Sequence, residues 1–440
     1  MSNIVFFGQA DAGKSTLAGY LVSRYDERYK LSRVIDSMKR YQINCDRRLT
    51  FSAIINTNRD EVESSQHLNS KSIHLRRINF SFGRVTIIDT PGSENYRKQR
   101  ERGMFYGNVG IFFMEINNVL DHKYMIETIA PIALWSKLEN KRMIFLLTKF
   151  DMVGYSEEAY VNALREINDI CACFGLDSIY TVIPVAIEVD RIKDLRPEAL
   201  DSTDLGENIC SKSVKMSWFT GLCLVDTIKR EIDELDKIGE DTPLIFCVTD
   251  QVDRPNSQAG KVWNVKILSG IMRINQEICL APVKDINNRF RVLIAKVKQL
   301  REDLSRYDCE DKVDIARPGE IYGLDIKHCF IDRHHVSKND YNAIASTCGF
   351  SPNTEFAMSD FFSFEIKETD FTNFRVGEEK QLVWFGRSLP FIVREKSGVI
   401  VRVQLKSTQI AFPMKYVAQT ILIKGQGMQD FYNAKLLEIG

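Results

Sequence analysis

Two kinds of hydrophobic pattern divide the sequence of 440 residues into two halves. In the first half, short apolar runs alternate with segments whose apolar residues recur every three to four positions. The apolar runs cover residues 3–7, 109–116, 142–147 and 180–185, and the helical segments cover 15–24, 124–138 and 157–174. This alternation predicts a mostly parallel β-sheet with helices on both faces.

The second half changes to the period of two that is typical of strands. A boundary is expected at residues 239–243, and strands are expected at 244–248, 262–268, 277–282, 289–297 and 320–326. A second set covers 362–369, 381–385, 389–395, 399–404 and 421–423, after a linker or long turn at 346–354. Short strands at this spacing predict closed β-barrels. We therefore expect an α/β domain over 1–238 and two all-β barrel domains over 239–345 and 346–440.

A polar stretch, residues 33–69, follows the first helical segment. It is rich in Arg, Asn, Ser and Asp, which predicts a long loop with some helix at 36–41. Long loops inside compact domains are uncommon and are often functional lids. Two strands, 72–80 and 84–88, are expected after it.

The first apolar run leads into Gly8-Gln9-Ala10-Asp11-Ala12-Gly13-Lys14-Ser15-Thr16. This is the G-x-x-x-x-G-K-S pattern of a phosphate-binding loop between a strand and a helix, so the first domain is predicted to be an α/β P-loop domain. The glycines let the backbone curl so that N–H groups point at phosphates. Lys14 supplies charge for the outer phosphates, and the Ser15 hydroxyl suits a magnesium ion. The residues expected to bind a nucleotide are Asp11, Ala12, Gly13, Lys14, Ser15 and Thr16, with Lys14 also catalytic.

Asp89-Thr90-Pro91-Gly92 closes the strand at 84–88. A carboxylate in this place can hold the magnesium shell, and the Gly92 N–H can meet the terminal phosphate. Taken alone, the tetrapeptide is a common turn sequence. Downstream of a phosphate loop, it predicts the second half of a nucleoside-triphosphatase site.

Thr148-Lys149-Phe150-Asp151 follows the strand at 142–147. The stem of Lys149 can lie along a flat base, and Asp151 can accept hydrogen bonds from the ring N–H and the exocyclic amine of guanine. Adenine offers no such donor pair, so Asp151 would select guanine. A surface loop explains the tetrapeptide by itself, but its place at a strand end favours the base-binding role.

Composition narrows the class of protein. The 59 basic and 59 acidic residues cancel, so the chain lacks the global basic field of nonspecific nucleic-acid binders and no DNA partner is expected, although a local basic patch remains open. The ten cysteines lack paired spacing, which favours reduced thiols in a cytoplasmic protein. The apolar runs are too short to span a bilayer and the chain enters a strand at once, so neither a membrane segment nor a leader is expected.

The segments 8–16, 89–92 and 148–151 together resemble the guanine-nucleotide-binding domain of the translation-factor GTPases, and the likeness covers nearly the whole chain. Met216-Ser217-Trp218-Phe219-Thr220-Gly221 is similar to a Trp-aromatic-x-Gly signature of eukaryotic and archaeal counterparts of elongation factor Tu. The GTPase subunit of bacterial sulfate adenylyltransferase also has this signature, and segments 151–158 and 253–256 look closer to that branch.

The resemblance implies GTP or GDP and Mg²⁺ as ligands. It implies that the segment with Ala186 and Ile187 offers a backbone N–H to guanine O6. It also places Ser72 where a threonine of the first switch normally closes over magnesium. The implied metal ligands are therefore Ser15, Ser72 and Asp89.

The sequence departs from the family pattern at the catalytic position. Ser93 stands where a histidine normally positions the attacking water, and a serine hydroxyl is too short and too weakly basic to replace an imidazole. The first switch has no clean counterpart in the sequence, and the nearest alignment puts Ser72 in the place of its threonine. Thr148 replaces the usual Asn, but base recognition is expected to survive this change. Losing a water-positioning group typically lowers the rate by about 10²–10³-fold. We therefore expect GTP binding with slow or partner-dependent hydrolysis.

Two further groups of residues are open to more than one interpretation. The basic residues Arg97, Lys98, Arg100 and Arg102 lie in the second-switch position, either on a solvated helix face or on a contact helix for a partner. His334-His335 suggests a metal pair, but no ligand stands at suitable spacing, so a surface turn is favoured.

Three functions follow from these observations. The first is a switch of the elongation-factor type, which conveys its nucleotide state to a protein or a tRNA-like RNA. The second is a regulatory GTPase subunit of an enzyme complex, as in sulfate activation. The third is a hydrolysis-deficient, GTP-bound scaffold.

Overall fold

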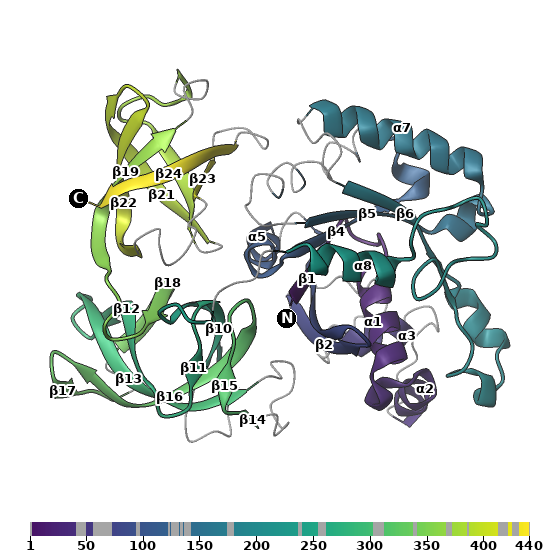
Figure 1. The fold of residues 1–440 in the computed structure, drawn as a ribbon, viewed down its shortest axis with the longest axis horizontal. Coiled ribbons are helices and arrows are strands. Elements are labelled where there is room, and N and C mark those ends of the chain that lie inside the picture. Colours follow the sequence, from purple (N-terminus) through teal and green to yellow (C-terminus); the bar gives the residue numbers. More distant parts are fainter. Residues whose placement is uncertain are drawn as a thin grey trace. The chain divides into compact units, whose positions relative to one another are not determined.

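The computed structural model describes most of the chain, in two compact units, Met1–Asp236 and Lys237–Gly440 (Figure 1). The first unit is α/β and the second is all β. The described residues are 2–40, 50–55, 73–93, 97–121, 124, 132, 135, 142–173, 180–235, 240–253, 261–301, 312–337, 341–366, 372–384, 387–411, 421–424 and 431–439. The division into three domains at 238/239 and 345/346 stays a prediction.

The first unit is built on a six-stranded sheet with the order β2-β3-β1-β4-β5-β6. Strand β2 runs antiparallel to β3, and the other neighbours are parallel, which confirms the predicted mostly parallel sheet. The carboxyl ends of the parallel strands therefore lie at one edge, where ligands bind in open α/β sheets. The strands are β1 (Ser2–Phe7), β2 (His74–Phe80), β3 (Gly83–Asp89), β4 (Val109–Glu115), β5 (Arg142–Thr148) and β6 (Tyr180–Pro184).

Side chains of β1 alternate between two buried faces of this sheet. Ile4 and Phe6 join a core with the helices α1 (Lys14–Tyr25), α3 (Thr50–Ile55) and α8 (Leu224–Asp233). On the other face, the ring of Phe7 lies 5.1 Å from that of Phe112. The other α-helices that the structure describes in this unit are α2 (Leu31–Arg40), α5 (Arg97–Tyr106) and α7 (Glu157–Cys173). No helix among the described residues is long and apolar enough to cross a membrane.

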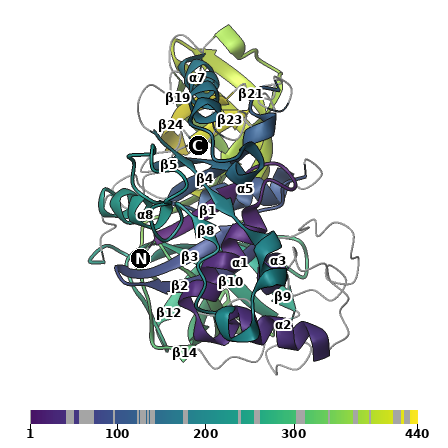
Figure 2. The same ribbon diagram turned by 90° about the vertical axis from the view of Figure 1, so that its right-hand side faces the viewer.

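Helix α3 packs directly on α1, where the sequence predicts a long loop. A Cβ on Gly19 would lie only 1.8 Å from the carbonyl oxygen of Phe51, so the two helix backbones touch, and both views show them side by side (Figures 1 and 2). Arg76 donates hydrogen bonds to the carbonyl oxygens of Ile54 (3.3 Å) and Ile55 (2.9 Å) at the end of α3. The loop prediction is therefore wrong for 33–35 and 50–55, whereas the helix expected at 36–41 coincides with α2 over 36–40. Residues 41–49 and 56–69 lie outside the described part.

The first sheet of the second unit has the order β14-β13-β12-β18-β9-β10-β16-β17. Strand β13 also pairs with β16, so the six strands from β13 through β12, β18, β9 and β10 to β16 form a ring. The strands are β9 (Ile245–Asp253), β10 (Lys261–Ser269), β12 (Glu277–Asp285), β13 (Phe290–Arg301), β14 (Lys312–Val313), β16 (Ile321–Ile331), β17 (His334–His335) and β18 (Tyr341–Phe350). Strands β11 (Met272–Arg273) and β15 (Ile315–Ala316) pair separately. His334 and His335 are both exposed.

Strand β18 stands partly where the sequence predicts a linker, at 346–354. Cys348 pairs with Ala281 of β12 and with Cys247 of β9, so residues 346–350 belong to the sheet. The ring of Phe246 occupies the space that a side chain at Gly349 would need, with a carbon 1.9 Å from the ideal Cβ position. Small residues in this strand make room for a neighbouring aromatic ring, which removes the apolar alternation that would have indicated a strand.

The last six strands form a closed barrel with the order β19-β22-β21-β20-β23-β24. Its interior is apolar, and Phe362, Phe364 and Phe374 are fully or almost fully buried. The fold class is thus an α/β P-loop domain followed by β-rich domains, one of which is a closed barrel. The strands are β19 (Ala357–Ile366), β20 (Glu379–Trp384), β21 (Arg387–Ser397), β22 (Ile400–Ala411), β23 (Ile421–Lys424) and β24 (Phe431–Ile439).

Replacing Gly19 by alanine is expected to destabilise the first unit. Gly→Ala inside a helix normally stabilises by about 1 kcal/mol, but here the new methyl group meets the Phe51 carbonyl and must push α3 away, at a cost of about 1–3 kcal/mol. Urea unfolding followed by circular dichroism should show a lower midpoint for G19A. Lys229→Ala, at an exposed position of α8, is the control and should leave the midpoint nearly unchanged. A midpoint raised by G19A would contradict the close packing of α3 on α1.

Candidate phosphate and base site

The phosphate-loop sequence lies between β1 and α1, and its backbone requires glycine at two positions. Gly13, directly before α1, has φ 92°, in the left-handed region that glycine adopts easily. A Cβ on Gly8 would lie 2.8 Å from the carbonyl oxygen of Phe113 in β4. The loop thus passes over the carboxyl end of β1 with its backbone against the next strand.

Lys14 turns back into this loop. Its Nζ donates hydrogen bonds to the carbonyl oxygens of Gly8 (2.9 Å) and Gln9 (2.6 Å), and the residue is 6% exposed. Burial lowers the pKa of Lys14 to about 8, and the nearby carboxylate of Asp89 acts in the opposite direction. A concentrated positive charge therefore lies at the N-terminal end of α1, where the helix dipole also favours an anion.

Ser15 and Asp89 meet beside Lys14. The Ser15 hydroxyl donates a hydrogen bond of 2.6 Å to Oδ2 of Asp89, whose side chain is 1% exposed. Burial raises the pKa of Asp89, while Lys14 and Ser15 favour its charged form. The other oxygen, Oδ1, is buried without a hydrogen-bond partner among the described residues. A buried carboxylate oxygen with unused capacity beside a hydroxyl group suits a hard divalent cation.

The donor set narrows the kind of cation. Within the described ranges, no group of three or more His, Cys, Asp or Glu side chains is placed to hold a metal. Magnesium is commonly held by one or two protein groups together with phosphate oxygens and water, so Ser15 and Asp89 fit this ion. Ser72, the third predicted ligand, lies outside the described residues.

The turn at Asp89–Gly92 is pressed against the phosphate loop. A Cβ on Gly92 would lie 2.5 Å from the Ala10 nitrogen, so only glycine fits there. The Thr90 hydroxyl donates a 2.6 Å hydrogen bond to the carbonyl oxygen of Phe6, at the end of β1. Arg100 of α5, only 8% exposed, donates to the Gly92 carbonyl oxygen at 3.4 Å and is not on a solvated face. Ser93 follows and is partly exposed.

Thr148 connects the phosphate loop with the end of β5. Its hydroxyl oxygen lies 3.0 Å from the carbonyl oxygen of Ala12 and 3.3 Å from that of Met114, and the residue is 6% exposed. The side chain therefore points at backbone oxygens of the loop and of β4. Thr148 thus connects the phosphate loop with the ends of β4 and β5.

Lys149 and Asp151 lie at the start of a short 3-10 helix, Phe150–Val153. Lys149 has φ 60°, a left-handed conformation that is uncommon outside glycine. Its Nζ forms a 2.8 Å ion pair with Glu115, the last residue of β4. Asp151 is exposed, as a group that contacts a ligand must be.

The segment with Ala186 and Ile187 lies beside Lys149 and Asp151. The Val185 N–H donates to the Leu147 carbonyl oxygen at 2.8 Å, and the Phe150 N–H donates to the Val185 carbonyl oxygen at 3.3 Å. Residues Ala186–Ile187 form β7, which pairs with β8 (Gly206–Glu207). All described residues that the sequence assigns to the phosphates and the base therefore lie at one edge of the sheet, in loops, at strand ends, at the start of α1 or in the short strand β7.

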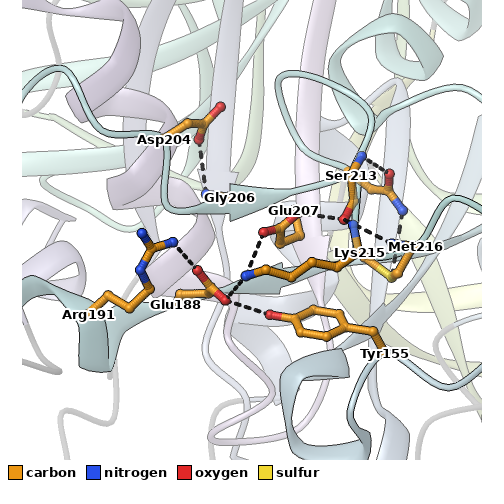
Figure 3. Close-up of polar contacts among 10 residues, drawn as sticks. Tyr155, Glu188, Arg191, Asp204, Gly206, Glu207, Ser213, Lys215 and Met216 are labelled. Atoms are coloured by element: carbon orange, nitrogen blue, oxygen red, sulfur yellow. Dashed lines mark hydrogen bonds and ion pairs between the residues drawn. The ribbon is translucent and has the colours of Figure 1, made fainter.

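A polar cluster surrounds Glu188, directly after β7 (Figure 3). Glu188 accepts hydrogen bonds from Tyr155 (2.8 Å) and Arg191 (2.5 Å), and also from Lys215. Lys215 pairs in addition with Glu207 at 3.0 Å. Neither this cluster nor Glu115 was identified from the sequence. The only signal for Glu115 is a charged residue that ends an apolar run, and the Glu188–Lys215 pair follows no local pattern.

Comparison with known proteins identifies the type of domain. The family model of the elongation factor Tu GTP-binding domain matches residues 1–277. Sulfate adenylyltransferase subunit 1 of Francisella tularensis subsp. novicida (strain U112) is 26% identical over 280 residues, which cover 62% of this chain and 53% of that protein. Elongation factor 1-alpha of Pyrococcus furiosus is 23% identical over 338 residues, which cover 77% and 68%. The chain thus spans about half the length of the Francisella relative.

Solved structures show the same fold. The S. cerevisiae Ski7 GTPase-like domain, bound to GTP, aligns with a TM-score of 0.73 at 14% identity, over 99% of this chain and 97% of that one. A bacterial selenocysteine-specific elongation factor, EF-Sec, aligns with a TM-score of 0.64 at 16% identity, over 100% of this chain and 58% of that one.

Thr148→Val is expected to destabilise the protein by about 1–2 kcal/mol. The substitution keeps the shape of the side chain but removes the hydroxyl that bonds to the buried carbonyl oxygens of Ala12 and Met114. Thr148→Ser keeps the hydroxyl and should lose much less. Chemical unfolding of the two variants in parallel measures the difference. Equal stability of T148V and T148S would show that these hydrogen bonds do not support the loop.

Proposed function

The chain belongs to the family of the elongation factor Tu GTP-binding domain, whose model matches residues 1–277 of its 440, and we propose on this basis that it is a guanine-nucleotide-dependent switch. GTP or GDP would bind at the edge of the sheet together with Mg²⁺. The observation that carries the proposal is the meeting of Ser15 and Asp89 at 2.6 Å, with Gly92 pressed against the phosphate loop. This geometry supports the proposal, because it brings together the two segments that would form a nucleoside-triphosphatase site.

Each end of the nucleotide has its own residues in this proposal. Lys14 and the backbone N–H groups of the loop would bind the phosphates, with the positive end of α1 behind them. Magnesium would neutralise phosphate charge when bound, and the residues that would hold it are Ser15 and Asp89, with Ser72 as a further ligand by resemblance. Lys149 would cover the base, Asp151 would accept from its two N–H groups, and the segment Ala186–Ile187 would donate to O6.

Hydrolysis is expected to be slow without a partner. Ser93 follows Gly92 and is partly exposed, and in this proposal it would lie near the attacking water. Its hydroxyl cannot reach as far as an imidazole or take up a proton as readily. The chemical step would then depend on a group that a partner supplies or would not take place at a useful rate.

In the primary proposal the partner is a macromolecule that binds the GTP-bound and GDP-bound forms of the chain with different affinity. In the elongation-factor version it is a tRNA-like RNA or the ribosome, which the similarity to elongation factor 1-alpha supports. In the second version the chain regulates an enzyme subunit, which the similarity to sulfate adenylyltransferase subunit 1 supports. The third version, a GTP-bound scaffold, is supported by Ser93 and by the first switch, which has no clean counterpart in the sequence.

Nucleotide binding tests the proposal directly. Purified protein should bind GTP and GDP in the presence of Mg²⁺ at least about 10²-fold more tightly than ATP, because adenine leaves the Asp151 carboxylate without donors. Asp151→Asn should weaken GTP binding and make xanthosine triphosphate the preferred nucleotide, since the asparagine amide can donate to the 2-oxo group of xanthine. Titration of fluorescent nucleotides measures both results. Equal affinity of the wild-type protein for GTP and ATP would refute guanine recognition at this site.

Hydrolysis provides a separate prediction. The wild-type protein alone should turn over GTP far below one per second, and Ser93→His should raise the rate by about tenfold or more if the imidazole can orient water. Phosphate release in single-turnover assays measures the chemical step. Ser93→Ala is the control and should leave the slow rate unchanged. Several turnovers per second by the unaided wild-type protein would show that the role assigned to Ser93 is wrong.

A further inference from the structure

The Glu188 cluster joins the two segments that would recognise guanine, and we propose that Glu188 and Lys215 are positioning residues for base selection. The inference rests on the proposed function, because it concerns the same base. Glu188 and Lys215 would not touch the nucleotide themselves. They would fix the distance between the loop of Asp151 and the backbone donors of Ala186–Ile187.

Tyr155 anchors the first segment. It stands four positions after Asp151 in a left-handed conformation, with φ 61°. Its N–H donates to the Phe150 carbonyl oxygen at 3.0 Å, and its own carbonyl oxygen accepts from Trp218 Nε1 at 3.0 Å. The backbone of Tyr155 is thus fixed on both sides, and its hydroxyl reaches Glu188 at 2.8 Å. Through Tyr155, Glu188 is connected to the loop that carries Asp151.

Glu188 and Glu207 anchor the second segment. Glu188 directly follows Ile187, and its N–H donates to the Leu205 carbonyl oxygen at 2.9 Å. Glu207 lies in β8, in register with Ala186 of β7. Lys215 binds both carboxylates, at 3.0 Å in the case of Glu207, and its ammonium lies 5.1 Å from the centre of the Tyr155 ring (Figure 3). One side chain therefore holds both strands of the short sheet and the tyrosine.

The short strand Ala186–Ile187 needs such support because few backbone hydrogen bonds hold it in place. It pairs with β8 over only two residues. Alanine and isoleucine side chains form no hydrogen bonds that would fix the backbone. A backbone N–H that must meet O6 works only within a narrow range of distances. The side chains next to the strand would therefore act together with the backbone hydrogen bonds of Val185 in fixing where this donor stands.

The charges of the cluster are balanced and partly buried. The Glu188 side chain is 13% exposed and faces Arg191 and Lys215, while Glu207 shares Lys215. Burial would raise the pKa of Glu188, but hydrogen bonds from Lys215, Arg191 and Tyr155 outweigh it and lower the pKa to about 2. Glu188 thus stays charged over the whole neutral range, and its geometry is maintained by three donors. A purely stabilising cluster would have the same charges, so the test must read out the base.

A pair of nucleotides separates positioning from stability. GTP has the O6 acceptor and the N1–H donor. The 2-aminopurine riboside triphosphate has neither, so it keeps only its amino group for Asp151 and cannot use the donor of Ala186–Ile187. Glu188→Ala should weaken GTP binding by about tenfold or more, since small misplacements at a binding group are costly. The same variant should change binding of the 2-aminopurine nucleotide by less than about threefold. The measured quantity is the dissociation constant for the 2-aminopurine nucleotide divided by that for GTP, and this ratio should fall in E188A.

Three further variants complete the test. Glu188→Gln keeps the acceptor for Tyr155 and should retain most of the GTP affinity. Tyr155→Phe should lower the ratio of dissociation constants, as Glu188→Ala does. Glu234→Ala is the matched control, because it breaks an ion pair of 2.8 Å with Arg142 elsewhere in the same unit, and it should leave both affinities unchanged. Circular dichroism establishes that each variant is folded at the assay temperature.

The outcomes distinguish this inference from the proposed function. Equal losses of affinity for both nucleotides, or unchanged GTP binding in E188A and Y155F, would overturn the positioning role and leave the proposed function intact. A wild-type protein that does not bind GTP would overturn both.

Discussion

The constraint on which the site depends is the close approach of backbones around the phosphate loop. Gly8 lies against Phe113 of β4, and Gly92 lies against Ala10, each with no room for a Cβ. Strand β1 lies between β3 and β4 in the sheet. The carboxyl ends of these three strands therefore bring the phosphate loop, the turn at Asp89–Gly92 and the end of β4 into contact. Any side chain at these positions would force the segments apart and would separate Ser15 from Asp89. The chemistry at this edge of the sheet thus depends first on the absence of two side chains.

Around this contact the chain buries charged groups that are costly to hold in a protein interior. Lys14 and Asp89 are almost fully buried. Each is partly compensated, Lys14 by loop carbonyls and Asp89 by the Ser15 hydroxyl. Burying a charge with less than full compensation destabilises the folded state, and such arrangements are concentrated at functional sites. The packed cores on both faces of the sheet supply the stability that makes this arrangement tolerable.

Sequence reasoning reaches furthest where the determinant is local. The phosphate loop, the turn at Asp89 and the segment after β5 could each be singled out because their characteristic residue types stand within a few positions of one another, and the structure brings all three to one edge of the sheet. The sequence did not reveal α3 or β18, because tertiary contacts decide both: Gly19 makes space for Phe51, and Gly349 makes space for Phe246. The Glu188–Lys215 pair was missed for a related reason, since its residues are 27 positions apart. Contacts between such distant residues leave no period or motif to read.

The docking of α3 also has a mechanical consequence. The connection from α1 to β2 is held in its middle, by the contact at Gly19 and by the Arg76 hydrogen bonds to Ile54 and Ile55. Helix α3 therefore joins α1 to β2, because one backbone contact connects it to the helix and two hydrogen bonds connect it to the strand. A displacement of α1 would be carried through α3 to β2, the strand at the edge of the sheet.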